Sequence, residues 1–266
     1  MRRNAGAHAL ERGSKTGSRI AYDHTVSERS VSDRGVSERG AAGPSASERG
    51  SAGTAPSPKA LITDWGGVLT SPLADAIDVW LAADRIDVER YKRVMRAWVK
   101  QAYDGAGSNP VHGLEDGSLP VEEFERLLAA ELRTVDGEPV EPTGLISRMF
   151  GAFSPVEPMY DALRAARAAG TRTALLSNSW GNDYPRHMFA DLFDAVVISS
   201  EVGLRKPDER IFRHALDLLG VEPAECVFVD DIEHNVRAAE RLGILGIHHT
   251  APDTTIAELR KLRLLP

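Results

Sequence analysis

Cysteine is almost absent from this 266-residue sequence, whose only example is Cys226. A single thiol cannot form an intrachain disulfide, which is the usage expected of a reducing compartment. No apolar run approaches the roughly 18 residues of a membrane-spanning helix. Residues 1–4 include two arginines, but no apolar segment follows them, which argues against a secretory signal. We therefore expect a cytoplasmic protein with no membrane segment.

Residues 1–58 have too few apolar side chains to offset the entropy of folding. A Ser-acid-Arg unit recurs from Ser27, Ser32, Ser37 and Ser47, and neither a strand nor a helix period is sustained. The composition predicts a disordered, low-complexity tail. The alternative is an interaction arm, because nine Lys and Arg stand against six Asp and Glu. Since Tyr22 is the only aromatic residue to stack on bases, nucleic acid is not expected as a partner.

Beyond the tail, short apolar runs alternate with amphipathic helical patterns. This alternation predicts an α/β fold with a doubly wound parallel sheet and right-handed crossovers. We assign the sheet and its helices to residues 59–72 and 154–266. The expected strands are 60–64, 172–177, 195–199, 226–230 and 245–249. Four helices are expected. One begins at Glu157, and the others cover about 208–219, 234–242 and 253–264.

Residues 73–153 interrupt the alternation with purely helical patterns. The apolar residues at helical spacing are Trp80, Leu81, Tyr91, Val94, Met95, Trp98 and Val99, then Phe124, Leu127, Leu128 and Leu132. We interpret this aromatic-rich stripe as core packing rather than substrate contact. Ser118, with Pro120 and Glu122 after it, is the expected N-cap of the second helical block.

Polar residues follow four of the expected strands or precede a helix. They are Asp64 with Gly66 and Gly67, Ser177 with Asn178, Lys206 before Pro207, and the pair Asp230 and Asp231. The carboxyl ends of parallel strands meet at one edge of the sheet, where ligands bind. Glycines let backbone amides approach an anion. Adjacent carboxylates repel each other without a cation, so the Asp230 pair favours a metal site, with helix capping as the alternative.

The order acid, hydroxyl, lysine and paired acids resembles the four motifs of the haloacid dehalogenase (HAD) superfamily. The resemblance covers residues 59–264 and implies a Rossmann-like core with a helical cap inserted between the first and second motifs, here 73–153. It implies a hydrolase, most simply a phosphatase for a small phosphorylated metabolite. In that reading Asp64 is the nucleophile and forms an aspartyl-phosphate.

The resemblance also implies a Mg²⁺ cofactor and a phosphate site. The metal ligands would be Asp64, the backbone carbonyl of Gly66 and Asp231, with Asp230 close by. Ser177, Asn178 and Lys206 would bind the phosphate, as would the turn at Gly66 and Gly67.

Gly66 departs from the commoner pattern of the superfamily, in which a second aspartate two residues after the nucleophile transfers protons. Glycine cannot do so, and such help is worth about 10²–10⁴-fold in rate. The departure predicts a slow phosphatase, one acting on a good leaving group such as a sugar 1-phosphate or acyl phosphate, or lost turnover. Two other functions stay open. One is a 2-haloacid dehalogenase-type carbon hydrolase, and the other is a catalytically weak binding module.

Overall fold

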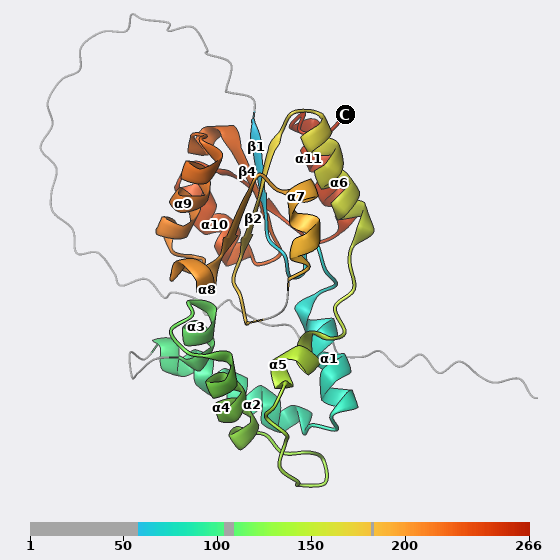
Figure 1. The fold of residues 1–266 in the computed structure, drawn as a ribbon, viewed down its shortest axis with the longest axis vertical. Helices are drawn as coiled ribbons and strands as arrows, with labels where there is room; N and C mark the ends of the chain where they lie inside the picture. Colours follow the sequence, from blue (N-terminus) through green and yellow to red (C-terminus); the bar gives the residue numbers. More distant parts are fainter. Residues whose placement is uncertain (1–57, 104–108, 182–183) are drawn as a thin grey trace, which may run out of the picture.

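A computed structural model describes residues 58–103, 109–181 and 184–266, so the predicted tail lies outside the described residues apart from Pro58. The centre of the fold is a five-stranded parallel sheet in the order β3-β2-β1-β4-β5 (Figure 1). Each strand lies within one residue of its predicted limits. The strands are β1 Ala60–Thr63, β2 Arg172–Ser177, β3 Ala195–Ile198, β4 Cys226–Asp230 and β5 Leu245–His248.

Helices cover both faces of the sheet, which confirms the doubly wound prediction. One apolar cluster joins the sheet to α6 (Glu157–Ala168), α7 (Phe189–Leu192) and α11 (Pro252–Lys261). A second joins its other face to α9 (Glu209–Leu219) and α10 (Glu233–Arg241). Because β1 is covered on both sides, all four of its residues are buried, including Leu61 and Ile62. Short elements complete this part: α8 Ser199–Val202 and the 3₁₀ turns Arg186–Met188 and Pro223–Glu225.

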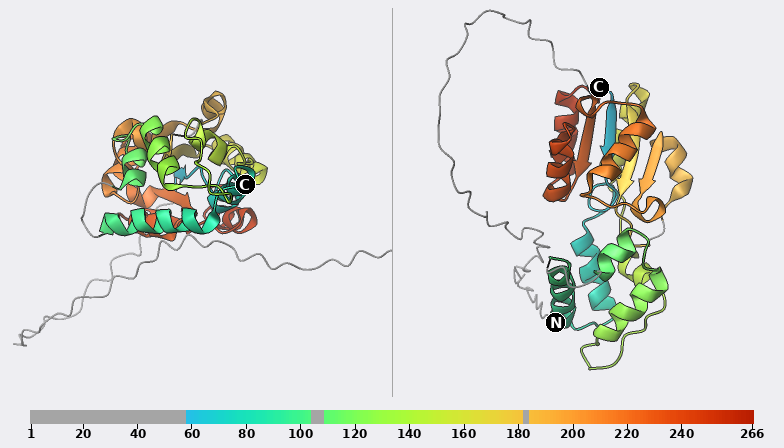
Figure 2. Two further views of the ribbon diagram at one scale, coloured as in Figure 1. Left: turned by 90° about the horizontal axis from the view of Figure 1, so that it is seen from below. Right: turned by 90° about the vertical axis from the view of Figure 1, so that its left-hand side faces the viewer.

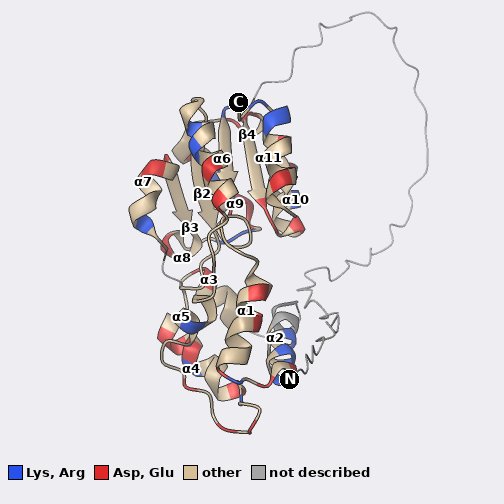
Figure 3. Ribbon diagram, turned by 90° about the vertical axis from the view of Figure 1, so that its right-hand side faces the viewer, with Lys and Arg blue, Asp and Glu red and all other residues tan. Residues whose placement is uncertain are grey.

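The described residues of the inserted segment form five helices. They lie beyond the carboxyl ends of the strands (Figures 1 and 2). They are α1 Leu73–Ala83, α2 Val88–Tyr103, α3 Pro110–Glu115, α4 Val121–Glu131 and α5 Leu145–Phe150. Lys and Arg predominate along α2, whereas Asp and Glu are frequent on α1 and α4 (Figure 3). None of the helices in the described ranges is both long and apolar enough to cross a membrane.

The aromatic stripe of the insert forms a hydrophobic core of its own, as predicted. Trp80, Tyr91 and Trp98 are buried in it, and Trp80 and Tyr91 meet edge to face with ring centroids 5.7 Å apart. Leu127 shares the helical spacing but is 39% exposed, so periodicity overstated its burial. The side chain of Val99 lies outside the described residues.

The predicted cap of α4 is wrong: the N-cap is Pro120, not Ser118, and the helix begins at Val121. Ser118 belongs to the preceding turn, where its backbone N–H donates to Asp116 Oδ1 at 2.9 Å. Its hydroxyl points back to the Gly113 carbonyl at 3.5 Å and is therefore turned away from the start of α4.

Two adjacent linkers connect the insert to the sheet. Ser71 N–H donates to the Ser154 carbonyl at 2.8 Å, and Val156 N–H donates to the Leu69 carbonyl at 2.9 Å. A bridge between Thr70 and Pro155 continues this antiparallel pairing. The chain thus leaves and rejoins the sheet layer at one place, directly after the turn that follows Asp64.

Candidate active site

Asp64 follows the last residue of β1 and is buried. Its backbone N–H donates to the Val229 carbonyl at 2.9 Å, which keeps it aligned with β4. Its carboxylate Oδ1 accepts a hydrogen bond from Trp65 N–H at 2.7 Å. Burial raises the pKa of Asp64, although the nearby charge of Lys206 opposes the shift. The result is a carboxylate held in one orientation at the edge of the sheet.

Lys206 is the only lysine buried among the described residues, with 1% of its surface exposed. Its ammonium Nζ lies 2.7 Å from Asp230 Oδ2 and 2.9 Å from Asp64 Oδ1. Burial alone would lower the pKa of Lys206, but the charges of Asp230 and Asp64 outweigh it and raise the pKa. Lys206 therefore stays protonated and joins the ends of β1 and β4 through charge-assisted hydrogen bonds.

Asp230 and Asp231 sit at the end of β4 with Asp64 beside them, and ligand oxygens of all three lie within 4.8 Å of one another. Asp230 accepts hydrogen bonds from Ile232 N–H and from Asn235 Nδ2. Burial, followed by the charges of Asp64 and Asp230, raises the pKa of Asp231 to about 8. Helix capping does not explain the pair, because Ile232 is the N-cap of α10.

These carboxylates make a site with more negative than positive charge. Three carboxylates face one ammonium group, so a divalent cation would restore the balance. Hard oxygen ligands of this kind are those that Mg²⁺ takes in proteins. The donor set therefore fits the predicted metal.

The two glycines after Asp64 differ in what they tolerate. Gly67 has φ +73°, and a Cβ built on it would lie 2.1 Å from Asp231 Oδ2, so only glycine fits. Gly66 lacks a positive φ, and a Cβ there would meet nothing within 4 Å. A side chain at position 66 is therefore sterically permitted, and the absence of a carboxyl there is not imposed by the turn.

Asn178 uses its side chain to fix the loop that carries Lys206. Asn178 Nδ2 donates to the Lys206 carbonyl at 3.0 Å, and Asn178 Oδ1 accepts from Lys206 N–H at 2.8 Å. Both ends of the amide group are thus bonded to one peptide segment. The side chain of Asn178 positions Lys206, a role that the motif alone did not indicate.

Tyr184 was missed by sequence reasoning and lies beside the predicted site. Its hydroxyl donates to Ser177 Oγ at 2.9 Å, at the end of β2. Its ring meets Trp65 edge to face, with centroids 5.6 Å apart. A tyrosine seven residues beyond Ser177, after a break in regular structure, carries no periodic signal that would have identified it.

Glu115, at the end of α3, ties the insert to the loops of the site and was also missed. Its carboxylate accepts hydrogen bonds from Trp180 Nε1 at 3.1 Å and from Arg205 Nε at 2.5 Å. Its backbone carbonyl accepts from the Ser199 hydroxyl, which also receives the N–H of Ser179. Trp180 lies two residues after Asn178 and Arg205 directly precedes Lys206. One buried carboxylate therefore contacts both polar loops.

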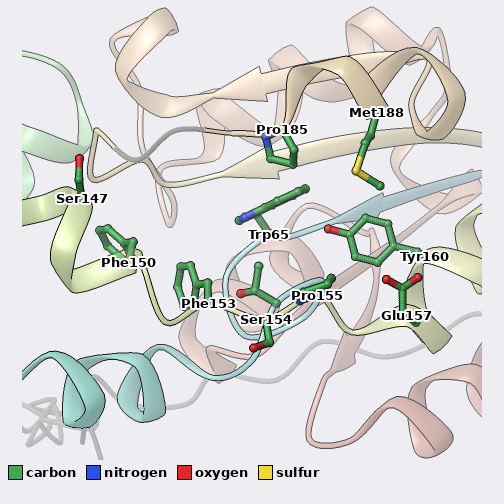
Figure 4. A pocket seen from close by; sticks show the side chains of 12 residues that line it. Trp65, Ser147, Phe150, Phe153, Ser154, Pro155, Glu157, Tyr160, Pro185 and Met188 are labelled. Carbon is green, nitrogen blue, oxygen red and sulfur yellow. The ribbon is translucent and has the colours of Figure 1, made fainter. Parts of the chain in front are cut away.

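A cavity of about 470 Å³ opens between the insert and the sheet layer (Figure 4). Trp65, Phe150 and Phe153 contribute to its apolar wall, together with Tyr160 and Met188. None of the predicted site residues lines it. The cavity adjoins the turn after Asp64 through Trp65 but is distinct from the carboxylate cluster.

Comparisons with known proteins agree with this geometry. Residues 58–243 match the haloacid dehalogenase-like hydrolase family. Acyl-CoA dehydrogenase family member 10 of Mus musculus is 30% identical over 214 residues, which are 78% of this chain and 19% of that protein. A sesquiterpene phosphatase of Aspergillus oryzae is 34% identical over 116 residues, 42% of this chain and 59% of that protein. The chain thus spans less than two thirds of the length of either relative.

Among solved structures, a HAD family enzyme from Bacteroides thetaiotaomicron superposes with a TM-score of 0.55 and 23% identity, covering 73% of this chain and 94% of that one. A complex of the same enzyme with magnesium and inorganic phosphate gives a TM-score of 0.51 and 23% identity, covering 73% and 95%. At this identity the similarity establishes the fold.

Proposed function

Because the chain belongs to the haloacid dehalogenase-like hydrolases, we propose that it is a Mg²⁺-dependent phosphatase acting on a small phosphorylated metabolite. The observation that carries the proposal is the cluster of Asp64, Asp230 and Asp231 around the buried Lys206. A metal-independent attack on carbon would have no use for this surplus of negative charge. Phosphoryl transfer does, because the cation that balances these carboxylates also offsets the negative charge of the phosphate group.

In the proposed reaction Asp64 attacks the phosphorus atom, the bond to the leaving oxygen breaks, and an aspartyl-phosphate forms. Water then hydrolyses that acyl phosphate and regenerates the carboxylate. Lys206 offsets the charge of Asp64 and of the incoming phosphate, and Asn178 keeps its loop in place. Ser177 accepts its hydrogen bond from Tyr184, which leaves the hydroxyl hydrogen of Ser177 to donate to a phosphate oxygen.

Asp64, Asp231 and the backbone carbonyl of Gly66 would hold Mg²⁺, with Asp230 beside them. The bound ion supplies charge neutralisation for phosphoryl transfer. The raised pKa of Asp231 supports this assignment, because a carboxyl that resists ionisation alone ionises readily beside a cation. The cytoplasmic location expected from the single cysteine, which is buried, stays a prediction.

The test is release of inorganic phosphate from p-nitrophenyl phosphate and a panel of phosphometabolites, with Mg²⁺ and with excess EDTA. We expect turnover only with the metal, and none from Asp64→Asn at an unchanged melting temperature. Asp217→Asn, an exposed acid on α9, is the matched control and should keep full activity. Undiminished activity in EDTA, or chloride release from a 2-haloacid, would replace the phosphatase with the dehalogenase-type function.

A second readout tests the metal without turnover. Mg²⁺ should raise the melting temperature of the unmodified chain, because a ligand that binds only the folded state stabilises it. Asp231→Asn should lose most of that increase. An equal increase in both proteins would remove Asp231 from the metal site.

A further inference from the structure

The proposed reaction lacks an obvious proton donor for the leaving group. Gly66 has no side chain, although the turn has room for one. The Lys206 ammonium is already bonded to two carboxylates, Asp64 and Asp230, and is directed at them. Asp230 and Asp231 would hold the proposed cation. Within the described part of the chain, a donor must therefore be another side chain at the proposed phosphate site.

The hydroxyl of Tyr184 is hydrogen-bonded to a side chain of the proposed phosphate site. Its hydroxyl reaches the end of β2, where it donates to Ser177 Oγ at 2.9 Å. Its ring packs edge to face between Trp65, at 5.6 Å, and Phe189, at 6.2 Å. Trp65 N–H in turn donates to Asp64 Oδ1, so the aromatic ring and the nucleophile share one neighbour. One hydrogen bond and two ring contacts therefore hold the phenol beside the proposed phosphate site.

We propose that Tyr184 supplies the leaving-group proton through the Ser177 hydroxyl, in place of the carboxyl missing at Gly66. This inference rests on the proposed phosphatase function. As Asp64 bonds to phosphorus and the ester P–O bond breaks, the Ser177 hydroxyl gives its hydrogen to the departing oxygen and takes the Tyr184 hydrogen along the 2.9 Å bond, so that alcohol leaves and Tyr184 becomes a phenolate. The phenolate then takes a proton from the water that attacks the aspartyl-phosphate. Asp64, phosphate and the neutral phenol are restored, so protons and charge balance over the cycle.

The acidity of the phenol suits one class of leaving group. Burial raises the pKa of Tyr184 to about 12, and the charge of Asp64 adds to the shift. An alkoxide is far more basic than a phenolate, since alcohols are as weakly acidic as water. Proton transfer from Tyr184 to an alkoxide is therefore downhill. An activated phenolate leaves without such help, so the substrates that depend on Tyr184 are alkyl phosphates.

The experiment compares Tyr184→Phe with the unmodified full chain in Mg²⁺, using glycerol 2-phosphate and p-nitrophenyl phosphate. We expect kcat for the alkyl ester to fall about 10²-fold and that for the aryl ester to stay within about twofold. Phenylalanine keeps the ring contacts, and a melting curve checks the fold. Loss of the Ser177 hydrogen bond alone would change KM for both esters alike. Tyr160→Phe is the matched control, because Tyr160 also packs edge-on against Trp65.

A second, independent experiment restores a carboxyl group at position 66. Gly66→Asp added to Tyr184→Phe should return most of the lost alkyl turnover. Equal losses for both esters, or no loss for either, would overturn the role of Tyr184 while leaving the phosphatase intact. Absence of phosphate release by the unmodified chain from either ester would overturn the proposed function and this inference with it.

Discussion

Without a bound cation, the stability of the folded chain should depend on pH in a direction set largely by Asp231. The pKa of this carboxyl rises from its ordinary value of 3.8 to about 8 in the folded protein, chiefly through burial. The folded state therefore holds a proton that the unfolded state has released. A raised folded pKa contributes stability below the unfolded pKa, and that stability is lost as pH rises toward 8.

The size of this loss of stability depends on the pH range over which the folded and unfolded states differ in the protonation of Asp231. Stability can fall by at most about 1.4 kcal/mol per pH unit while one group differs by one proton. Structural relaxation and partial hydration of the carboxyl make the fall smaller than this limit. We therefore expect the free energy of unfolding to decrease by about 1.5–3 kcal/mol between roughly pH 5 and pH 7.5. For a chain of this size that loss lowers the melting temperature by roughly 3–12 °C. Asp64, whose pKa burial raises to about 6, adds to the loss at the lower end of this window. His112 and His249, whose pKa values burial lowers, oppose it. Carboxyls with lowered pKa, such as Glu225, act below the window.

The assay is thermal unfolding in excess EDTA at several pH values, followed by circular dichroism. Asp231→Asn removes the contribution of this carboxyl and should make the fall in melting temperature smaller, while His112 and His249 act in both proteins. Excess Mg²⁺ should remove the loss of stability, because the ion stabilises the ionised carboxylates. A melting temperature that does not fall across this window, or that falls equally in Asp231→Asn, would refute the reasoning.

Three further predictions concern other parts of the molecule. Gly66→Asp should fold normally and raise turnover of alkyl phosphates, whereas Gly67→Asp should unfold or lose Mg²⁺ binding, as a melting curve with and without the ion would show. Glu115→Ala should cost about 1–2 kcal/mol in urea unfolding, because it removes the acceptor of two half-buried donors, Trp180 Nε1 and Arg205 Nε. Exposed Glu122→Ala on α4 should cost less than about 0.5 kcal/mol. A chain beginning at Ser57 should retain kcat/KM and melting temperature, and a large loss of either would assign the preceding residues a role in the folded protein.

The sequence carried enough information to place the sheet and the main polar residues of the site. Buried parallel strands appear as continuous apolar runs, so Asp64 and Asp230 could be placed at strand ends without knowledge of the fold. The parallel topology then brings those ends together, which explains why Lys206 meets both carboxylates. The division of the chain into a core and a cap at 73–153 stays a prediction.

The residues that sequence reasoning missed depend on contacts between distant segments. Glu115 meets Arg205 across 90 positions, and no local pattern distinguishes it from any other acid near a helix end. Tyr184 lies outside regular structure, where periodicity gives no direction for a side chain. The wrong assignment of Ser118 as the N-cap has a local cause. The helix begins after Pro120, and the turn at Gly117, which has a positive φ, directs the Ser118 side chain away from the start of the helix.

The paired linkers at Ser71 and Ser154 have a consequence for how such a protein can diversify. Since the polypeptide departs and returns at neighbouring points, the intervening segment can be lengthened, shortened or exchanged without altering the register of β1 and β2. Under the proposed function, substitutions at the carboxyl ends of the strands would then alter the reaction, whereas exchange of residues 72–153 would alter the surroundings of the site. A chimaera that carries a relative's helices between these two serines, with an acid in place of Glu115 to bond Trp180 and Arg205, should therefore fold with β1 and β2 in the same register.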